Sequence, residues 1–291
     1  MLPVWLAVAQ SLGAAILFAV GIQFLNLGLR HGDSRTGTLI DIGTTTFFYW
    51  LLSPIFLKQG HWTSTGFLIF AAVGLFRPLI SANLALISVR RLGPTLTSTL
   101  TSTTPLFAAI LGVLLLGETL TVFLIAGTLA VVLGTALPTL QRDSGTRSWP
   151  LWVLMFPLGA AGLRSFAHAM IGMGLTFTPE PLFAGLAAYS VSFLMALLVQ
   201  AWQGELTRVD WQRPGLMWFV AAGIMHGLAV WVMNAALATT PVSIVVPLVS
   251  TTPLFTLALS LILFRREIIT WRQVAMVFIV LFGVVLIVAR A

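Results

Sequence analysis

Apolar residues occur in long runs along this chain, and short polar segments that hold most of the charges and prolines separate the runs. About 20 consecutive apolar residues can cross the hydrocarbon core of a bilayer as a helix. Ten such runs fit between the polar segments. The pattern therefore predicts ten membrane-spanning helices, at residues 3–28, 36–57, 63–88, 94–116, 120–140, 149–177, 180–202, 215–238, 241–263 and 270–289.

Composition supports an all-α, multi-pass membrane protein. Hydrophobic residues make up 58% of the 291 residues and charged residues 8%, whereas an ordinary soluble domain has about 25% charged residues. The absence of cysteine excludes disulfides, thiolate metal sites and cysteine nucleophiles. The net charge of +7 comes from arginines scattered over short connections, which is typical of topology signals and not of nucleic-acid binding.

A hexapeptide repeat indicates an internal duplication. The letters STTPLF occur at 102–107 and again at 250–255, and a polar segment interrupts the chain near 141–149. We therefore expect a first five-helix repeat at 1–140, a connecting loop at 141–148 and a second repeat at 149–291. Five spans per half is an odd number, so the second half enters the membrane inverted. Inverted repeats with proline-interrupted helices at matching positions are typical of secondary transporters.

These features resemble the EamA-type ten-helix members of the drug/metabolite transporter superfamily. The best motif is STTPLF followed by LGE within 102–118, while the second copy departs from it with LFRRE at 263–267. The resemblance implies ten helices around a central cavity that works by alternating access, and it does not fix a substrate.

Two arginines fall near the middle of predicted spans, where an ionisable group costs at least about 2.5–3.5 kcal/mol. Arg77 lies in the third span and Arg164 in the sixth, and Asp41 is the only acid inside a span. Each arginine could pair with an acid or cap the carbonyls of a broken helix. Because acids are scarce, we expect at least one arginine to bind an anionic group of the substrate, such as a carboxylate.

Histidines and asparagines extend this predicted site. Arg164 and His168 are four residues apart and share a helix face, and His226 and Asn234 lie eight apart in span 8. The short motif that starts at Asn83 corresponds to the motif that starts at Asn234 in the second half. A membrane histidine can be a hydrogen-bonded structural group or a proton switch, and the sequence shows no acidic relay for the second role.

Hydroxyl side chains concentrate at the start of span 4, in TLTSTLTSTT. Ser98, Thr101 and Ser102 follow a spacing of three to four residues and either allow close helix packing or line the cavity. The matching segment of span 9, IVVPLVSTT, is less polar, so we expect two unlike walls and a substrate with one polar and one apolar end. Tyr189 and Trp231 are deep aromatics that either line the cavity or pack elsewhere.

The two prolines of the repeat interrupt their helices. Pro105 removes the amide that would bond to the carbonyl of Thr101, and Pro253 does the same to Val249. We expect both prolines to act as hinges that let part of span 4 or span 9 swing during transport.

Cations are distributed unevenly between the two sides of the predicted membrane protein. The connections after odd-numbered spans, with the start of span 10, hold eleven cations, and the other side holds Lys58 and Arg290. The positive-inside rule then places both termini outside the cytoplasm. We expect a multi-pass protein of the bacterial inner (plasma) membrane.

Together these patterns predict a secondary transporter that exports amino-acid-like or carboxylate-bearing compounds. We expect an anionic or zwitterionic small molecule and the lipid bilayer as partners, no nucleic acid, no cofactor or metal, and a monomer or weak dimer. A channel or facilitator remains an alternative. An enzyme is not expected, because the chain has no GxSxG, HExxH or paired carboxylates.

Overall fold

The computed structural model describes residues 4–77, 79–139, 150–202, 215–264 and 270–289, and every regular element in these ranges is a helix. The predicted connecting loop at 141–148 lies outside the described residues. The α-helices are α1 (Val4–Gly28), α2 (Ser34–Phe56), α3 (Thr65–Phe76), α4 (Leu79–Leu92), α5 (Pro94–Thr101), α6 (Thr104–Leu116), α7 (Val122–Ala136), α8 (Met155–Phe177), α9 (Pro181–Trp202), α10 (Leu216–Leu237), α11 (Val242–Val249), α12 (Thr252–Leu259) and α13 (Trp271–Val288).

Length and hydropathy identify eight helical stretches in the described residues that could cross a membrane. Two further apolar helices, Thr65–Phe76 and Val122–Ala136, are shorter and fall within the third and fifth predicted spans. The all-α membrane fold is thereby confirmed, whereas the count of ten crossings stays a prediction.

The third predicted span is broken, which the sequence analysis did not foresee. Arg77 ends α3 with φ −129° and ψ 134°, and α4 begins at Leu79. The residue after Arg77 is a proline, and a residue that precedes proline is disfavoured in the helical region. The break therefore places the arginine at a helix end in the middle of the bundle.

Both STTPLF segments interrupt a helix in the same way, as predicted. Ser102 and Thr103 separate α5 from α6, and Ser250 and Thr251 separate α11 from α12. Each proline has no amide to donate to the carbonyl four residues earlier, and a threonine hydroxyl donates to that carbonyl instead. Thr104 Oγ1 donates to Thr101 O and Thr252 Oγ1 donates to Val249 O, both at 2.7 Å. The bends are present, and hinge movement stays a prediction.

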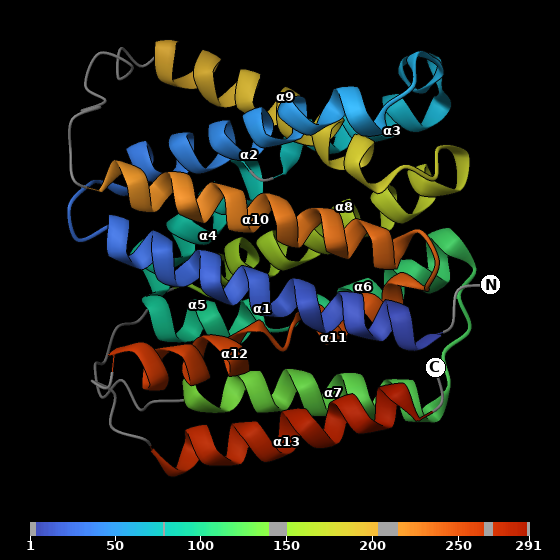
Figure 1. Ribbon diagram of the computed structural model, residues 1–291. Coiled ribbons are helices and arrows are strands. Elements are labelled where there is room, and N and C mark those ends of the chain that lie inside the picture. The colour runs from blue at the N-terminus through green and yellow to red at the C-terminus, as the bar shows by residue number, and fades with distance from the viewer. Residues whose placement is uncertain (1–3, 78, 140–149, 203–214, 265–269, 290–291) are drawn as a thin grey trace.

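Helix contacts follow an approximate twofold relation between the two halves. The pairing of α1 with α10 corresponds to that of α8 with α3 and α4, and the pairing of α2 with α10 corresponds to that of α9 with α3. Glycines repeat the relation in detail: the Phe70 ring fills the space beside Gly174, and the Phe219 ring fills the space beside Gly28. In Figure 1, α1 runs away from the end of the bundle where both termini lie, whereas α8 runs toward it.

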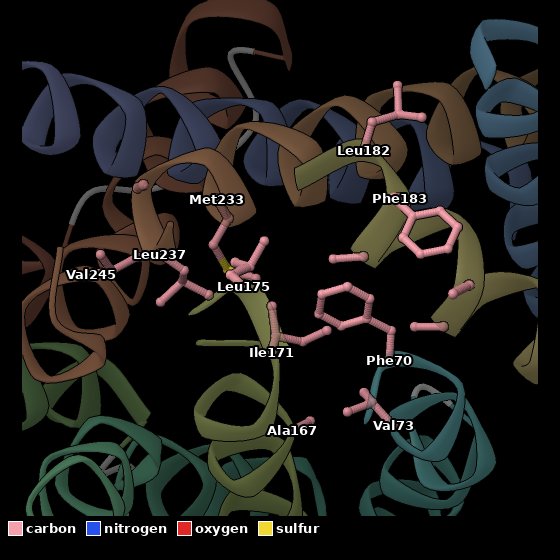
Figure 2. Close-up of a cluster of buried hydrophobic side chains, with 14 of the residues drawn as sticks. Phe70, Val73, Ala167, Ile171, Leu175, Leu182, Phe183, Met233, Leu237 and Val245 are labelled. Atoms are coloured by element: carbon pink, nitrogen blue, oxygen red, sulfur yellow. The ribbon is translucent and has the colours of Figure 1, made fainter. Parts of the chain in front are cut away.

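An apolar core fills the end of the bundle that holds the termini. It joins the C-terminal halves of α8 and α10 to the start of α9 and to α3 and α11, with Phe70, Ile171, Leu175, Phe183 and Met233 among its buried side chains. Figure 2 shows these side chains pointing toward one another.

Candidate functional site

A cavity of about 810 Å³ extends from the middle of the bundle toward the end opposite the termini. Its far end is marked by Asn26 near the end of α1, Pro138 after α7, and Gln273 at the start of α13. Its inner end is marked by Arg164 and Met233. The volume is in the range of small-molecule sites.

Most of the residues predicted for the site line this cavity. Eight of the eleven predicted binding residues and both predicted hinge prolines do so: Arg77, Ser98, Thr101, Ser102, Arg164, His168, Tyr189, His226, Pro105 and Pro253. Their elements lie far apart in sequence, and the twofold packing brings them together around one space.

Three predicted residues do not line the cavity. Asn234 is 1% exposed and its Nδ2 donates to the carbonyl of Pro181 at 3.2 Å, which ties α10 to α9. Trp231 stacks edge-on with Phe56, with ring centroids 5.1 Å apart, and the side chain of Asn83 is exposed elsewhere on α4. Eight residues turn a helix through about 800°, which is 80° beyond two full turns, so His226 lines the cavity while Asn234 points away from it.

The two half-buried arginines face the cavity, and neither has an acidic partner in the described part of the chain. Among the described residues, neither Arg77 nor Arg164 has a carboxylate within salt-bridge distance or a hydrogen-bond acceptor. His168, one turn beyond Arg164, is 5% exposed and has no hydrogen-bond partner at either ring nitrogen. Buried cationic and polar groups are normally satisfied. The three side chains therefore bring hydrogen-bond donors to the cavity that no described protein group accepts from.

The second cavity-lining histidine is paired. His226 Nδ1 lies 2.8 Å from Asp41 Oδ1, so the only acid inside a predicted span joins α2 to α10. The sequence analysis named both residues but had no means of connecting them, because 185 positions separate them.

The hydroxyls of α5 mostly donate to their own helix. Thr101 Oγ1 donates to Thr97 O at 2.9 Å and Ser102 Oγ to Ser98 O at 2.9 Å. Such local bonds satisfy the donors and leave oxygen lone pairs facing the cavity. Close helix packing and cavity lining were the alternatives in the sequence analysis, and these residues line the cavity.

Twofold counterparts around the cavity differ in chemistry. The Gly28 and Gly174 contacts relate α1 to α8 by 146 positions, so Phe18 corresponds to Arg164 and Ile22 to His168. All four of these side chains line the cavity. An aromatic ring and an aliphatic side chain on α1 thus face a cation and a histidine on α8.

The same contrast continues between α5 and α11. The repeat relates these helices by 148 positions, so Ser98 corresponds to Val246 and Thr101 to Val249, and all four line the cavity. We call the side formed by Arg77, Ser98, Thr101, Arg164 and His168 the cationic wall. The side formed by Phe18, Ile22, His226, Val246 and Val249 is called the apolar wall.

An acidic residue fastens the end of the bundle that holds the termini. The carboxylate of Glu118, in the turn between α6 and α7, accepts hydrogen bonds from the amides of Val242 at 2.6 Å and Ser243 at 2.9 Å. These amides are the first two of α11, where a helix has unpaired donors and a partial positive charge. Glu118 thereby links the two halves across the closed end.

Comparison with known proteins assigns the family. The sequence matches the EamA-like transporter family over residues 5–140 and again over residues 149–289. The chain belongs to the EamA-like transporter family. It is therefore a membrane transporter and not an enzyme, as predicted. No curated protein matches the chain.

Solved structures support the fold of this family member. One crystal structure, described only as that of a protein, has a TM-score of 0.78 and 14% sequence identity to the chain. The match covers 98% of this chain and 97% of the other. At this identity the likeness shows the fold alone.

Sequence reasoning missed several functional features of this EamA-like chain. Gln23 and Asn26 of α1 line the cavity, and Gln23 Nε2 donates to Thr256 O of α12 at 3.0 Å. Their spacing in the sequence does not distinguish these two amide side chains from residues that only pack between helices. Glu118 was visible as part of a repeated turn, but its acceptor role required the position of α11. The described residues contain no cluster of three metal-ligating side chains.

Proposed function

We propose that the chain is a secondary active transporter that moves a small anionic or zwitterionic metabolite by alternating access. The observation that carries this proposal is the pair of arginines, Arg77 and Arg164, which face the cavity with no acidic partner among the described residues. A carboxylate satisfies a guanidinium by two parallel hydrogen bonds. An apolar end on the substrate would suit Phe18 and Val249 on the facing wall.

Alternating access is supported by the unequal ends of the bundle. The cavity reaches toward one end, while the apolar core and Glu118 occupy the other. The open end holds Arg30 in the connection after α1, Arg35 in the first turn of α2, and Arg90 and Arg91 in the last turn of α4. By the positive-inside rule this end is cytoplasmic and the structure represents an inward-open state. The other loop arginines, Arg142, Arg147, Arg208, Arg213, Arg265 and Arg266, lie outside the described residues, as does Arg290 near the C-terminus.

Ten spans in two inverted halves, an export direction and a bacterial inner membrane complete the proposal. The twofold contacts and the opposite directions of α1 and α8 support the inverted arrangement. The export direction and the bacterial membrane are expectations from the sequence analysis.

The experiment that tests this function is flux through purified protein in liposomes. A carrier gives a rate that saturates with substrate and rises when unlabelled substrate is present on the opposite side. A channel, the alternative, gives a flux that grows linearly with concentration and shows no such trans-stimulation. Linear flux without trans-stimulation would therefore reject the alternating-access proposal.

A further inference from the structure

Asp41 and His226 form a hydrogen-bonded pair beside the cavity. His226 lines the cavity, and the side chains of His226 and Asp41 are 13% and 18% exposed. The His226 ring packs over Gly21 of α1, where a Cβ would collide with it. The pair is therefore held in a fixed place in the apolar wall, yet it is not sealed from the cavity.

Packing between helices does not require this pair. Gly223 of α10 packs against the Asp41 carbonyl and Thr44 of α2, and its counterpart Gly74 of α3 packs against Ala188 and Val191 of α9 in the same manner. The counterpart of His226 is then Arg77, and the counterpart of Asp41 is Ala188, which has no acidic group. The same helix crossing thus forms without an ion pair in the other half.

Two neutral hydrogen bonds already join α2 to α10. Thr45 Oγ1 donates to Gly223 O at 2.7 Å, and Tyr49 Oη donates to Gly227 O at 2.7 Å. The two acceptor residues, Gly223 and Gly227, lie before and after His226 on α10. The contact between α2 and α10 is therefore already held by these bonds without the Asp41–His226 pair. An ionisable pair within the membrane-spanning part of a protein is costly and marks a functional position by default.

The other titratable groups near the pair are few. α9 contributes Tyr189, α2 itself contributes Tyr49, and α8 contributes Arg164 and His168, while Arg77 faces the same cavity from the opposite wall. Neither α1 nor α11, which also pack against α10, contains a titratable side chain. Among the described residues, Asp41 is therefore the only carboxylate near the cavity, and it pairs with His226.

We propose that the Asp41–His226 pair binds a proton that travels with an anionic substrate, an inference that rests on the proposed transport function. The proton comes from cavity water and adds to the His226 imidazole. The protonated pair is neutral as a whole, and loss of that proton to water leaves a charge of −1 beside the cavity. One proton is bound and one is released in each cycle, so charge and mass balance.

The sign of the coupling follows from these charges. The deprotonated pair repels a substrate anion and compensates part of the charge of Arg77 and Arg164, so it weakens anion binding. The protonated pair removes both effects. By linkage, a bound anion favours the proton as much as the proton favours the anion, so the two move in the same direction. Anion affinity is then high at low pH and falls as pH rises through the titration of the pair.

The first arm of the test needs no substrate. Histidine-labelled protein is titrated between pH 5 and 8.5 by NMR, and His226 is assigned among the four histidines by its loss in H226Q. We expect the His226 signals to move within this range, where imidazoles change charge, and D41N to alter that movement. His226 signals that stay constant over the range would overturn the proton site.

The second arm measures binding of phenylacetate, an ionised carboxylate with an apolar ring, at pH 6 and pH 8. We expect affinity to be higher at pH 6 by about fivefold or more, the lower end of typical coupling between sites. In H226Q, which removes the imidazole that carries the proton, this ratio should fall close to one. The matched controls T45V and Y49F each remove a neutral α2–α10 bond and should keep the wild-type ratio.

Two results would overturn the coupling. One is an H226Q protein with the wild-type pH ratio, and the other is a loss of the ratio in the controls as in H226Q, which would assign the pair a structural role. Failure of phenylacetate to bind at any pH counts against the anion site of the proposed function. The proton site is then decided by the NMR arm, so the two failures are distinguishable.

Discussion

The two walls of the cavity are built from matching backbone and carry unlike chemistry. Arg164 and Thr101 on the cationic wall stand at positions whose counterparts on the apolar wall are Phe18 and Val249. Small residues at helix crossings, such as Gly74 and Gly223, are the same in both halves. The comparison shows that the duplication fixes how helices pack, and that residues facing the cavity are free to differ.

This difference between the walls determines the orientation in which a ligand binds. Two guanidinium groups that have no acidic partner among the described residues can bind a carboxylate, and facing aliphatic and aromatic side chains can bury an apolar group. A site with equal walls would bind such a molecule in two opposite orientations. The asymmetry therefore selects one orientation, with the charged end toward α8.

The largest expected effect comes from removing a cation of the cationic wall. Arg164→Met or Arg77→Met should weaken binding of a carboxylate ligand by about 2–5 kcal/mol, the usual cost of truncating one partner of a buried charge pair. Phe18→Met on the apolar wall is the control and should keep the preference for a carboxylate over its uncharged amide. Equal affinity of both arginine variants and the wild type would remove the basis for the cationic wall.

The hinge prolines should affect both walls alike, because the bend is a property of the shared backbone. Pro105→Ala and Pro253→Ala restore an amide donor to the helix, so each should stiffen its bend. We expect turnover to slow by roughly tenfold, a barrier increase of about 1.4 kcal/mol, with little change in substrate affinity. Liposome flux and equilibrium binding measure the two quantities, and unchanged flux in both variants contradicts the hinge role.

Glu118 should matter for the apolar wall more than for the cationic wall. It caps α11, which carries Val246 and Val249, and the counterpart of Val242 at the start of α5 is Pro94, which has no amide to donate. Glu118→Ala should lower stability by about 0.5–2 kcal/mol, the typical cost of losing a helix cap. The exposed neighbour substitution Thr119→Ala is the control, and thermal unfolding is the measurement. Equal melting temperatures for the two variants would show that the cap contributes nothing.

The smallest expected effect tests the hydroxyls. Thr101→Val makes this position of the cationic wall identical to Val249 of the apolar wall. Loss of one acceptor should weaken binding of a polar ligand by about 1 kcal/mol, the net value of a typical hydrogen bond. The reverse change, Val249→Thr, should not strengthen binding by the same amount, since no cation lies beside it. Unchanged affinity in Thr101→Val would assign the hydroxyls to helix packing alone.

Periodicity and proline chemistry predicted the fold well, because both act along a single helix. The apolar runs located the spans, and the STTPLF prolines located the breaks in the fourth and ninth spans. The break at Arg77 was also readable from the proline that follows it, yet the apolar run across it concealed the interruption.

Pairings between distant helices were not predictable in the same way. Asp41 and His226 meet only because α2 packs on α10, and Glu118 reaches Val242 only because α11 starts beside the α6–α7 turn. Asn234 was assigned to the site from spacing, and its true orientation depended on a helical rotation of 80° from His226. Contacts between distant helices can be predicted only when the arrangement of the helices is known. No local pattern in a single sequence gives that arrangement.

The central claim, that the cationic wall binds an anionic group, is tested most directly by a thermal-shift screen of purified protein with matched metabolite pairs. Each pair consists of a carboxylate and its uncharged amide. The account predicts that carboxylates raise the melting temperature of the wild type while their amides do not, and that Arg164→Met abolishes the difference. Stabilisation by the amides or by organic cations, unchanged in Arg164→Met, would contradict it.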